Sequence, residues 1–212
     1  MVEMATAPAL LRIVDGRRLE KRVRDALDPG GFLADPEGRA RQLPRFFYEI
    51  STWEDAVNTK LAPNFHLWEL VQTDVREAGP LRAFPRYVPC AVTLLAFALQ
   101  RFRDRVGATV HVAANGGYRS PRHALTHGAS THCWATAANI YRIGNTYLDD
   151  QEVVERYAEI ARDVLPGVWV QPYGTGPGDV DDHLHLDVGY VISIPRDAPG
   201  ERYHPKLEWG AL

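Results

Sequence analysis

Apolar and polar residues recur along the chain with periods that predict both helices and strands. The strongest helical spacing covers 89–105, where Pro89 suits a first helical position and Gly107 would follow the last turn. Shorter helices are expected over 65–75 and from 149 to about 164, the second with carboxylates at its positive end. These three segments are the helices of the predicted fold.

Alternating apolar and polar positions lie between and after these helices, and they predict strands. The expected strands cover 109–112, 135–143, 167–171 and 183–192. From residue 89 onward the resulting order is helix, strand, strand, helix, strand, strand. It predicts an α+β domain with a small, largely antiparallel sheet and flanking helices.

The first 60 residues have a different character. Residues 11–27 mix charged and aliphatic side chains at a spacing that favours an amphipathic helix, ended by the Asp-Pro-Gly-Gly sequence at 28–31. This region has no catalytic pattern, so we interpret it as a segment packed on the main domain; an oligomerisation segment or a substrate lid is the alternative. We therefore distinguish an N-terminal extension (1–60), a main domain (64–192) and a C-terminal tail (193–212).

Composition limits the classes of function. The chain has 212 residues, 45% of them hydrophobic and 24% charged, and a formal net charge of −3. These values are typical of a globular protein and give no electrostatic reason to expect a nucleic acid or an anionic membrane as partner. The longest apolar run is too short for a membrane span, and the N-terminus lacks the order of a signal peptide, so a cytoplasmic location is expected. Two cysteines, Cys90 and Cys133, do not make a disulfide framework.

The histidines are the most informative residues chemically. In the segment 182–187, Asp-His-Leu-His-Leu-Asp, strand alternation places His183, His185 and Asp187 on one face. Two imidazoles on one face can bind one metal ion, or one can bind the metal while the other contacts a bound water. The alternative interpretation is a solvated strand face that has histidines by chance.

Two further motifs lie upstream of this segment. His132 is followed seven positions later by Asn139, whose side-chain oxygen could complete a metal site if the chain turns between them. In 116–121, a glycine turn after a strand places Arg119 where its guanidinium could bind a carboxylate or stabilise an oxyanion. Taken alone, each residue has a structural alternative. His132 could be a loop histidine that only forms hydrogen bonds, and Arg119 could belong to a surface ion pair.

In this order, the three motifs resemble the zinc-dependent D-alanyl-D-alanine carboxypeptidases and the related L-alanyl-D-glutamate endolysins. The family pattern Ser-x-His-x-x-Gly-x-Ala-x-Asp is matched at Ser130, His132 and Ala137. The Tyr-Arg-Ser element is matched at 118–120, and the C-terminal His-x-His at 183–185, with Asp182 as the preceding acid. The resemblance covers about 64–192 and implies the fold that these enzymes share with hedgehog signalling domains.

The resemblance implies a zinc ion held by His132, Asn139 and His185. Two positions depart from the family pattern, since Ala135 replaces a glycine and Asn139 replaces the aspartate ligand. An amide oxygen can bind a metal but has no charge, so zinc affinity should be weaker. Either the metal site is altered, with Asn139 or else Asp187 or His183 as a ligand, or hydrolysis has been lost; we favour the altered site.

The resemblance also implies catalytic roles. Asp182 would take the proton of the attacking water and pass it to the leaving amine. His183 would contact the water or the tetrahedral intermediate, and Arg119 would stabilise the oxyanion or hold a substrate carboxylate. The expected function is a zinc metallopeptidase that hydrolyses short peptides with D-residues, of the peptidoglycan type. The alternatives are the same fold used by a metal-dependent enzyme of specialised metabolism, and a non-catalytic peptide- or metal-binding module.

Overall fold

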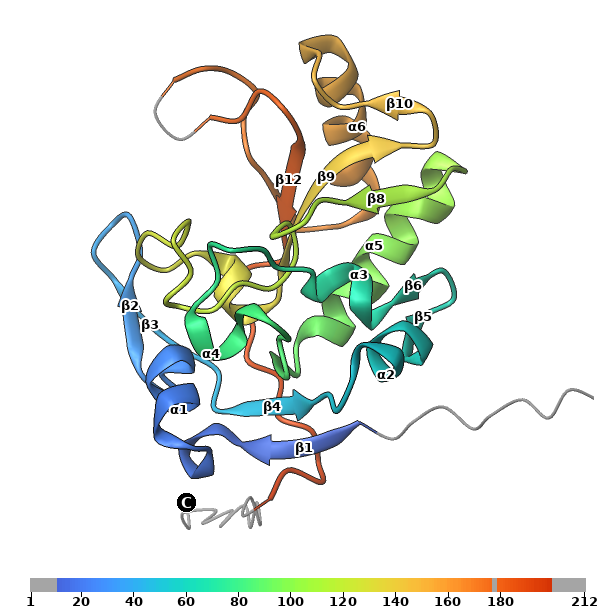
Figure 1. Ribbon diagram of the computed structural model, residues 1–212. Helices are drawn as coiled ribbons and strands as arrows, with labels where there is room; N and C mark the ends of the chain where they lie inside the picture. The colour runs from blue at the N-terminus through green and yellow to red at the C-terminus, as the bar shows by residue number, and fades with distance from the viewer. Residues whose placement is uncertain (1–10, 177–178, 200–212) are drawn as a thin grey trace, which may run out of the picture.

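Two antiparallel sheets organise the described part of the chain, residues 11–176 and 179–199 of a computed structural model (Figure 1). The smaller sheet has the order β1–β4–β7 and contains β1 (Arg12–Asp15), β4 (Phe46–Glu49) and β7 (Tyr87–Pro89). The larger sheet has the order β10–β9–β12–β11, with β8 also paired to β9. Its strands are β8 (Val110–Val112), β9 (Ala137–Ile143), β10 (Thr146–Tyr147), β11 (Trp169–Val170) and β12 (Leu184–Asp187).

Short hairpins and helices surround these sheets. The hairpins are β2 (Phe32–Ala34) with β3 (Ala40–Gln42), and β5 (Lys60–Ala62) with β6 (Phe65–His66). The α-helices are α1 (Lys21–Leu27), α2 (Trp53–Asn58), α3 (Leu67–Val71), α4 (Gly79–Arg82), α5 (Val92–Val106) and α6 (Gln151–Val164). Two 3-10 helices, η1 (Gly16–Arg18) and η2 (Thr131–Trp134), complete the described elements. The fold is α+β with antiparallel sheets, as predicted.

The segment 11–27 differs from the sequence prediction. It is not a single amphipathic helix, because its first part is strand β1 and α1 begins only at Lys21. In the smaller sheet, Val14 of β1 faces Phe47 of β4, and both side chains are buried. Pairing with a strand far along the chain therefore outweighs the local helical spacing.

The other elements that the sequence predicted lie close to their expected ranges. Helix α5 begins at Val92 because Pro89 belongs to β7, and it ends before Gly107, which takes the left-handed backbone conformation (φ 66°). Strand β12 is shorter than predicted, and His183 directly precedes it. No helix in the described ranges is long and apolar enough to cross a bilayer.

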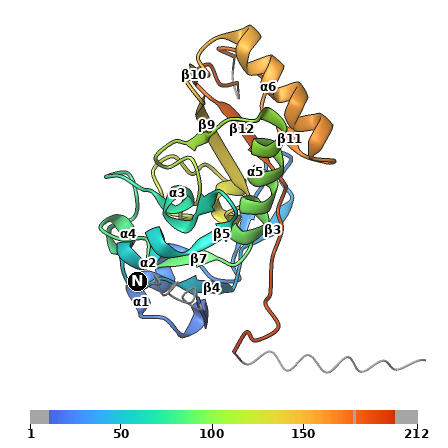
Figure 2. The same cartoon turned by 90° about the vertical axis from the view of Figure 1, so that its right-hand side faces the viewer.

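Helices α5 and α6 lie on one side of β9 and β12, as Figure 2 shows. On that side Leu184 and Leu186 of β12 are fully buried in the hydrophobic core. Successive side chains of a strand alternate between faces, so His185 and Asp187 project from the opposite face of the sheet. The helices thus cover the apolar face and leave the histidine-bearing face to the loops.

The hydrophobic core continues across the predicted boundary at residue 60. Val14 and Phe47 belong to the same cluster of buried side chains as Leu95 of α5 and Leu184 of β12. The C-terminal segment passes from the larger sheet to the smaller one (Figure 1), where Ala198 packs in the cluster that contains Cys90. The N-terminal segment is therefore part of the packed structure that holds the larger sheet. Both cysteines are buried and form no disulfide.

Candidate functional site

Strands β9 and β12 bring two of the predicted site residues face to face. In their antiparallel register His185 is paired with Asn139, and Asp187 is paired with Ala137. Directly opposed residues project to the same side of a sheet, so their side chains are in contact range. The Asn139 side-chain oxygen accordingly lies 2.7 Å from Nδ1 of His185.

His132 joins this pair from the turn before β9. Its ring lies beside that of His185, with centroids 5.1 Å apart and planes at 70°. The turn requires Ala135 in the left-handed conformation (φ 56°), and this is the position where the family pattern has glycine. Because the left-handed conformation favours glycine, the backbone here agrees with the family pattern even though the residue does not.

The protonation of His132 follows from its surroundings. Its Nδ1 lies 2.6 Å from the carbonyl oxygen of Gly117, which can only accept, so Nδ1 carries the proton. Burial lowers the pKa of His132 well below its usual value, and the charge of Arg119 lowers it further. The ring is therefore neutral, and its Nε2 has a lone pair that could bind a metal ion.

Asp187 extends the cluster along β12. Its carboxylate is buried, with 6% of the residue exposed, and one oxygen, Oδ2, lies 3.4 Å from Nε2 of His185. Thr131 donates its hydroxyl to the same oxygen at 3.1 Å, and the backbone N–H of Gly189 donates to Oδ1 at 2.9 Å. These contacts hold the carboxylate in place beside the imidazole.

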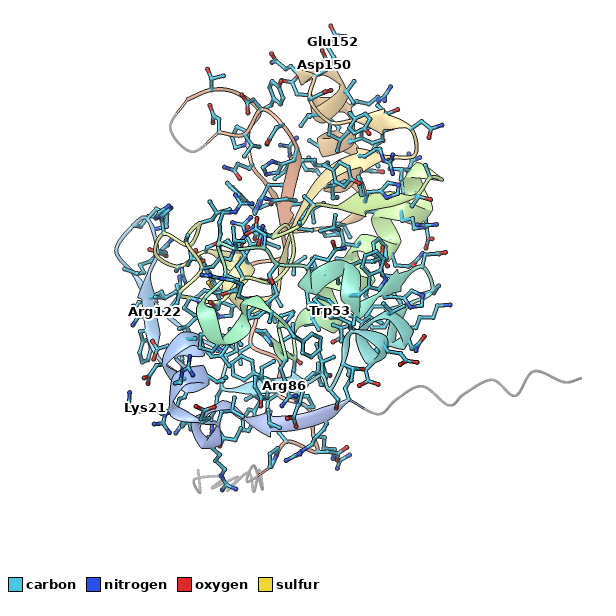
Figure 3. The ribbon with its side chains drawn as sticks, viewed as in Figure 1. Lys21, Trp53, Arg86, Arg122, Asp150 and Glu152 are labelled. Carbon is cyan, nitrogen blue, oxygen red and sulfur yellow. The ribbon has the colours of Figure 1, made fainter. Side chains whose placement is uncertain are left out.

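Arg119 lies against the same cluster. Its guanidinium is buried and donates from Nε to the carbonyl oxygen of Asn115, and burial lowers its pKa to about 10. Its charge contributes, after the effect of burial, to lowering the pKa values of both His132 and His183. By contrast, Arg122 of the same loop lies toward α1 (Figure 3), where it adds to the effect of Lys21 in lowering the pKa of Asp25.

The loop that bears Arg119 is anchored by a buried glutamate. Glu77, of which 1% is exposed, accepts the Ser120 hydroxyl at 2.5 Å and the Ser120 backbone N–H at 3.1 Å. It also accepts the N–H of Ala78 at 2.6 Å. Sequence reasoning missed Glu77, because nothing in its local pattern distinguishes it from a solvated acidic residue.

Asp182 and His183 lie at the entrance to β12. The Asp182 side chain is 79% exposed and accepts a hydrogen bond from Nδ1 of His183. Burial lowers the pKa of His183, and the contact with Asp182 opposes that effect. The predicted general base therefore lies on the solvent side of the histidine cluster.

A hollow of about 480 Å³ opens on the histidine-bearing face. It is lined by His185 and Asp187, and also by residues that the sequence motifs did not indicate: Glu37, His127, Trp169 and Tyr190. Glu37 comes from the turn of the β2–β3 hairpin, so the N-terminal segment forms one wall. This hairpin is attached to the site by the Trp134 indole N–H, which donates to the carbonyl oxygen of Gln42 at 2.9 Å.

The side chains around His185 include nitrogen and oxygen donors of the kind that a metal ion binds. His132, Asn139 and His185 are brought together, as the ring contact and the 2.7 Å contact show. Within residues 11–176 and 179–199, however, no three His, Cys, Asp or Glu side chains are already grouped around one point. The three residues supply the nitrogen and oxygen donors that zinc accepts. Their assignment as ligands stays a prediction.

Comparisons with family models, with curated proteins and with solved structures give no match.

Proposed function

We propose that the protein is a zinc-dependent hydrolase of the D-alanyl-D-alanine carboxypeptidase type, with the hedgehog/DD-peptidase fold, that cleaves short peptides containing D-residues. The main support is that three motifs far apart in the sequence meet at one place. His132 lies beside His185, and Arg119 is close enough to both His132 and His183 to affect their pKa values. The left-handed backbone at Ala135 supports the same assignment of fold.

His132 and His185 would hold the ion, with Asn139 as the predicted third ligand. When bound, zinc supplies a Lewis acid that lowers the pKa of its water toward about 7. The protein's own contribution is to fix the His132 ring, since its Nδ1 faces the carbonyl oxygen of Gly117. Such hydrogen bonds keep metal-binding rings in one orientation.

The charged groups around the rings would handle the substrate and its protons. Arg119 is buried, so its charge acts through a medium of low dielectric constant and can stabilise an oxyanion or hold a substrate carboxylate. Asp182 is exposed and bonded to His183, which suits a group that takes a proton from water at the mouth of the site. The hollow beside His185 is large enough for a few residues of a peptide.

The test combines metal analysis with turnover. The purified protein should contain zinc, hydrolyse D-alanyl-D-alanine or an L-alanyl-D-glutamyl peptide, lose activity with a chelator and regain it with zinc. Asp182→Asn should lower kcat by about 10²-fold or more and leave the zinc content intact. Asp181→Asn, an exposed neighbour, is the matched control and should retain activity. A protein that contains zinc but releases no product from either substrate would contradict the proposed reaction.

A second candidate is a non-catalytic peptide-binding module. The neutral side chain at Asn139 favours it, because the family's charged ligand is missing at that position. Such a module should bind the peptides without turnover and should tolerate Asp182→Asn in binding assays.

A further inference from the structure

A second hollow, of about 490 Å³, lies between helix α3 and strands β8 and β9, and we call it the α3 hollow. Its lining includes Trp68 and Glu69 of α3, Gln72 just after this helix, His111 of β8 and Tyr141 of β9. None of these five residues lines the hollow beside His185. The α3 hollow is therefore a separate cavity, which the proposed function does not use.

The α3 hollow lies on the histidine-bearing face of the larger sheet. Asn139 and Tyr141 are two residues apart on β9, and Ile140 between them is fully buried in the core. Strand alternation therefore projects Tyr141 from the face that bears Asn139, about 7 Å farther along the strand. The pairing of β8 with β9 is irregular between His111 and Val112, and here the rings of His111 and Tyr141 lie 6.0 Å apart. The α3 hollow is thus next to the candidate site, on the β8 side of Asn139.

The aromatic side chains of the α3 hollow have polar groups that are available to a ligand. Trp68 is 36% exposed and Tyr141 is half-buried. Within the part of the chain that the structure describes, the Trp68 indole N–H and the Tyr141 hydroxyl have no hydrogen-bond partner, and neither does the side-chain amide of Gln72. The hollow therefore combines aromatic ring surface with several free donors and acceptors.

The charges around the α3 hollow favour a neutral ligand. Of the described residues that line it, Glu69 is the one acid and none is lysine or arginine. A carboxylate oxygen of Glu69 already accepts the backbone N–H of His66 at 2.7 Å, so its charge is engaged within the protein. Burial lowers the pKa of His111, and the charges of Arg142 and Arg103 lower it further, so this ring is neutral. An anion would lack a positive counter-charge here.

We propose that the α3 hollow binds a sugar ring of a glycan. A pyranose ring is neutral and presents C–H groups on its faces, which pack on aromatic side chains. Its hydroxyl groups exchange hydrogen bonds with the polar groups of Trp68, Tyr141 and Gln72. Binding of the sugar requires neither zinc nor hydrolysis. The position beside Asn139 further identifies the substrate as a peptide joined to a glycan, and this second step rests on the proposed function.

The experiment is a titration of the intact protein with chitotriose, a neutral trisaccharide, followed by NMR of the indole N–H groups. The signal of Trp68, assigned by its absence from the spectrum of Trp68→Phe, should shift and saturate. Tetramethylammonium, a cation that aromatic side chains also bind, is titrated separately. The inference is overturned if chitotriose shifts no indole signal, if it shifts Trp169 in the other hollow instead of Trp68, or if tetramethylammonium binds more tightly than chitotriose.

Variants locate the binding energy. Trp68→Ala should weaken chitotriose binding by about 10-fold or more, as expected for a tryptophan at the centre of a contact. Gln72→Ala, which removes only hydrogen-bonding groups, should weaken it by about 2- to 10-fold. Trp53→Ala, which removes an exposed tryptophan of α2 (Figure 3), is the matched control and should bind as the parent does. Circular dichroism checks that each variant is folded. Equal affinity in Trp68→Ala, Gln72→Ala and the parent overturns the inference.

The chelator-treated protein separates this inference from the proposed function. It should bind chitotriose with the affinity of the untreated protein, because the lining of the α3 hollow contacts the sugar directly. Chitotriose binding without any peptide hydrolysis would contradict the proposed reaction and leave the sugar site in place. Peptide hydrolysis without chitotriose binding would overturn the sugar site alone.

Discussion

The amide oxygen of Asn139 lies 2.7 Å from Nδ1 of His185, and the two residues face each other across β9 and β12. The family pattern has an aspartate at position 139, which could make the same contact with a full negative charge. A group that accepts a hydrogen bond from the second ring nitrogen of a metal-binding histidine fixes the orientation of the ring and raises its basicity. If zinc binds His185 as proposed, the contact between these two residues would adjust the affinity of the site for the ion.

Replacing this amide by a carboxylate should strengthen metal binding. Asn139→Asp adds a negative charge next to His185, and we expect zinc affinity to rise by about 10-fold or more. Competition with a chromophoric chelator measures the change. Asn145→Asp, in the exposed turn after β9, adds the same charge away from the site and should leave the affinity at the parent value. Equal affinities for all three proteins would show that position 139 does not act on the metal.

Stability should fall at mildly acidic pH. Burial lowers the pKa values of His132 and His183, so the folded protein binds fewer protons than the unfolded chain, whose histidines titrate near about 6.5. The stability is thus fully present above about pH 6.5 and is lost as the pH falls below it. Melting temperatures of the chelator-treated protein, measured between pH 7.5 and 5, test whether stability falls as the pH is lowered.

A histidine variant separates this effect from general acid sensitivity. His132→Gln should reduce the decline in melting temperature, because the buried ring no longer has to accept a proton on unfolding. His127→Gln, in which an exposed histidine is replaced, is the control and should behave as the parent. A decline that is as steep in His132→Gln as in the parent would contradict the prediction.

Glycine at position 135 should stabilise the protein. Ala135 has φ 56°, and a residue with a Cβ atom pays about 1–2 kcal/mol in the left-handed conformation. After the entropy cost of glycine, Ala135→Gly should raise the free energy of unfolding by about 0.5–1 kcal/mol. Urea denaturation measures this change in the free energy of unfolding. Ala138→Gly, in the extended strand β9, should instead lower stability, and the strain argument fails if both variants change in the same direction.

Removing Glu77 should destabilise the loop that bears Arg119. Glu77→Ala leaves the Ser120 hydroxyl and the N–H groups of Ser120 and Ala78 without their buried acceptor. Each unsatisfied buried group costs about 1–3 kcal/mol, so the loss of unfolding free energy should exceed about 2 kcal/mol. Urea denaturation checks this value. Glu54→Ala, at an exposed site on α2, should change stability by less than about 0.5 kcal/mol.

The sequence alone was sufficient to predict the structure wherever local periodicity controls it. The alternation in His185-Leu186-Asp187 places both polar side chains on one face of β12, and the structure has Leu186 buried on the other. Helical spacing located α5, and Gly107 marked its end, because helix termination depends on the backbone freedom of a single residue. The family resemblance also implied that His132 and His185 meet, and their ring centroids are 5.1 Å apart, while their role as metal ligands stays a prediction.

Only the tertiary structure decided features that depend on pairing between distant segments. Residues 12–15 form β1 rather than a helix, since β4 offers them a partner that local spacing does not reveal. Glu37 reaches the hollow because its hairpin is bonded to Trp134, nearly a hundred residues later. The contacts of His185 with Asn139 and Asp187 depend on the register of β12 on β9 and on the rotation of one ring. Register and side-chain rotation result from the packing of the whole molecule, and for that reason the sequence could name these residues but could not assign their partners.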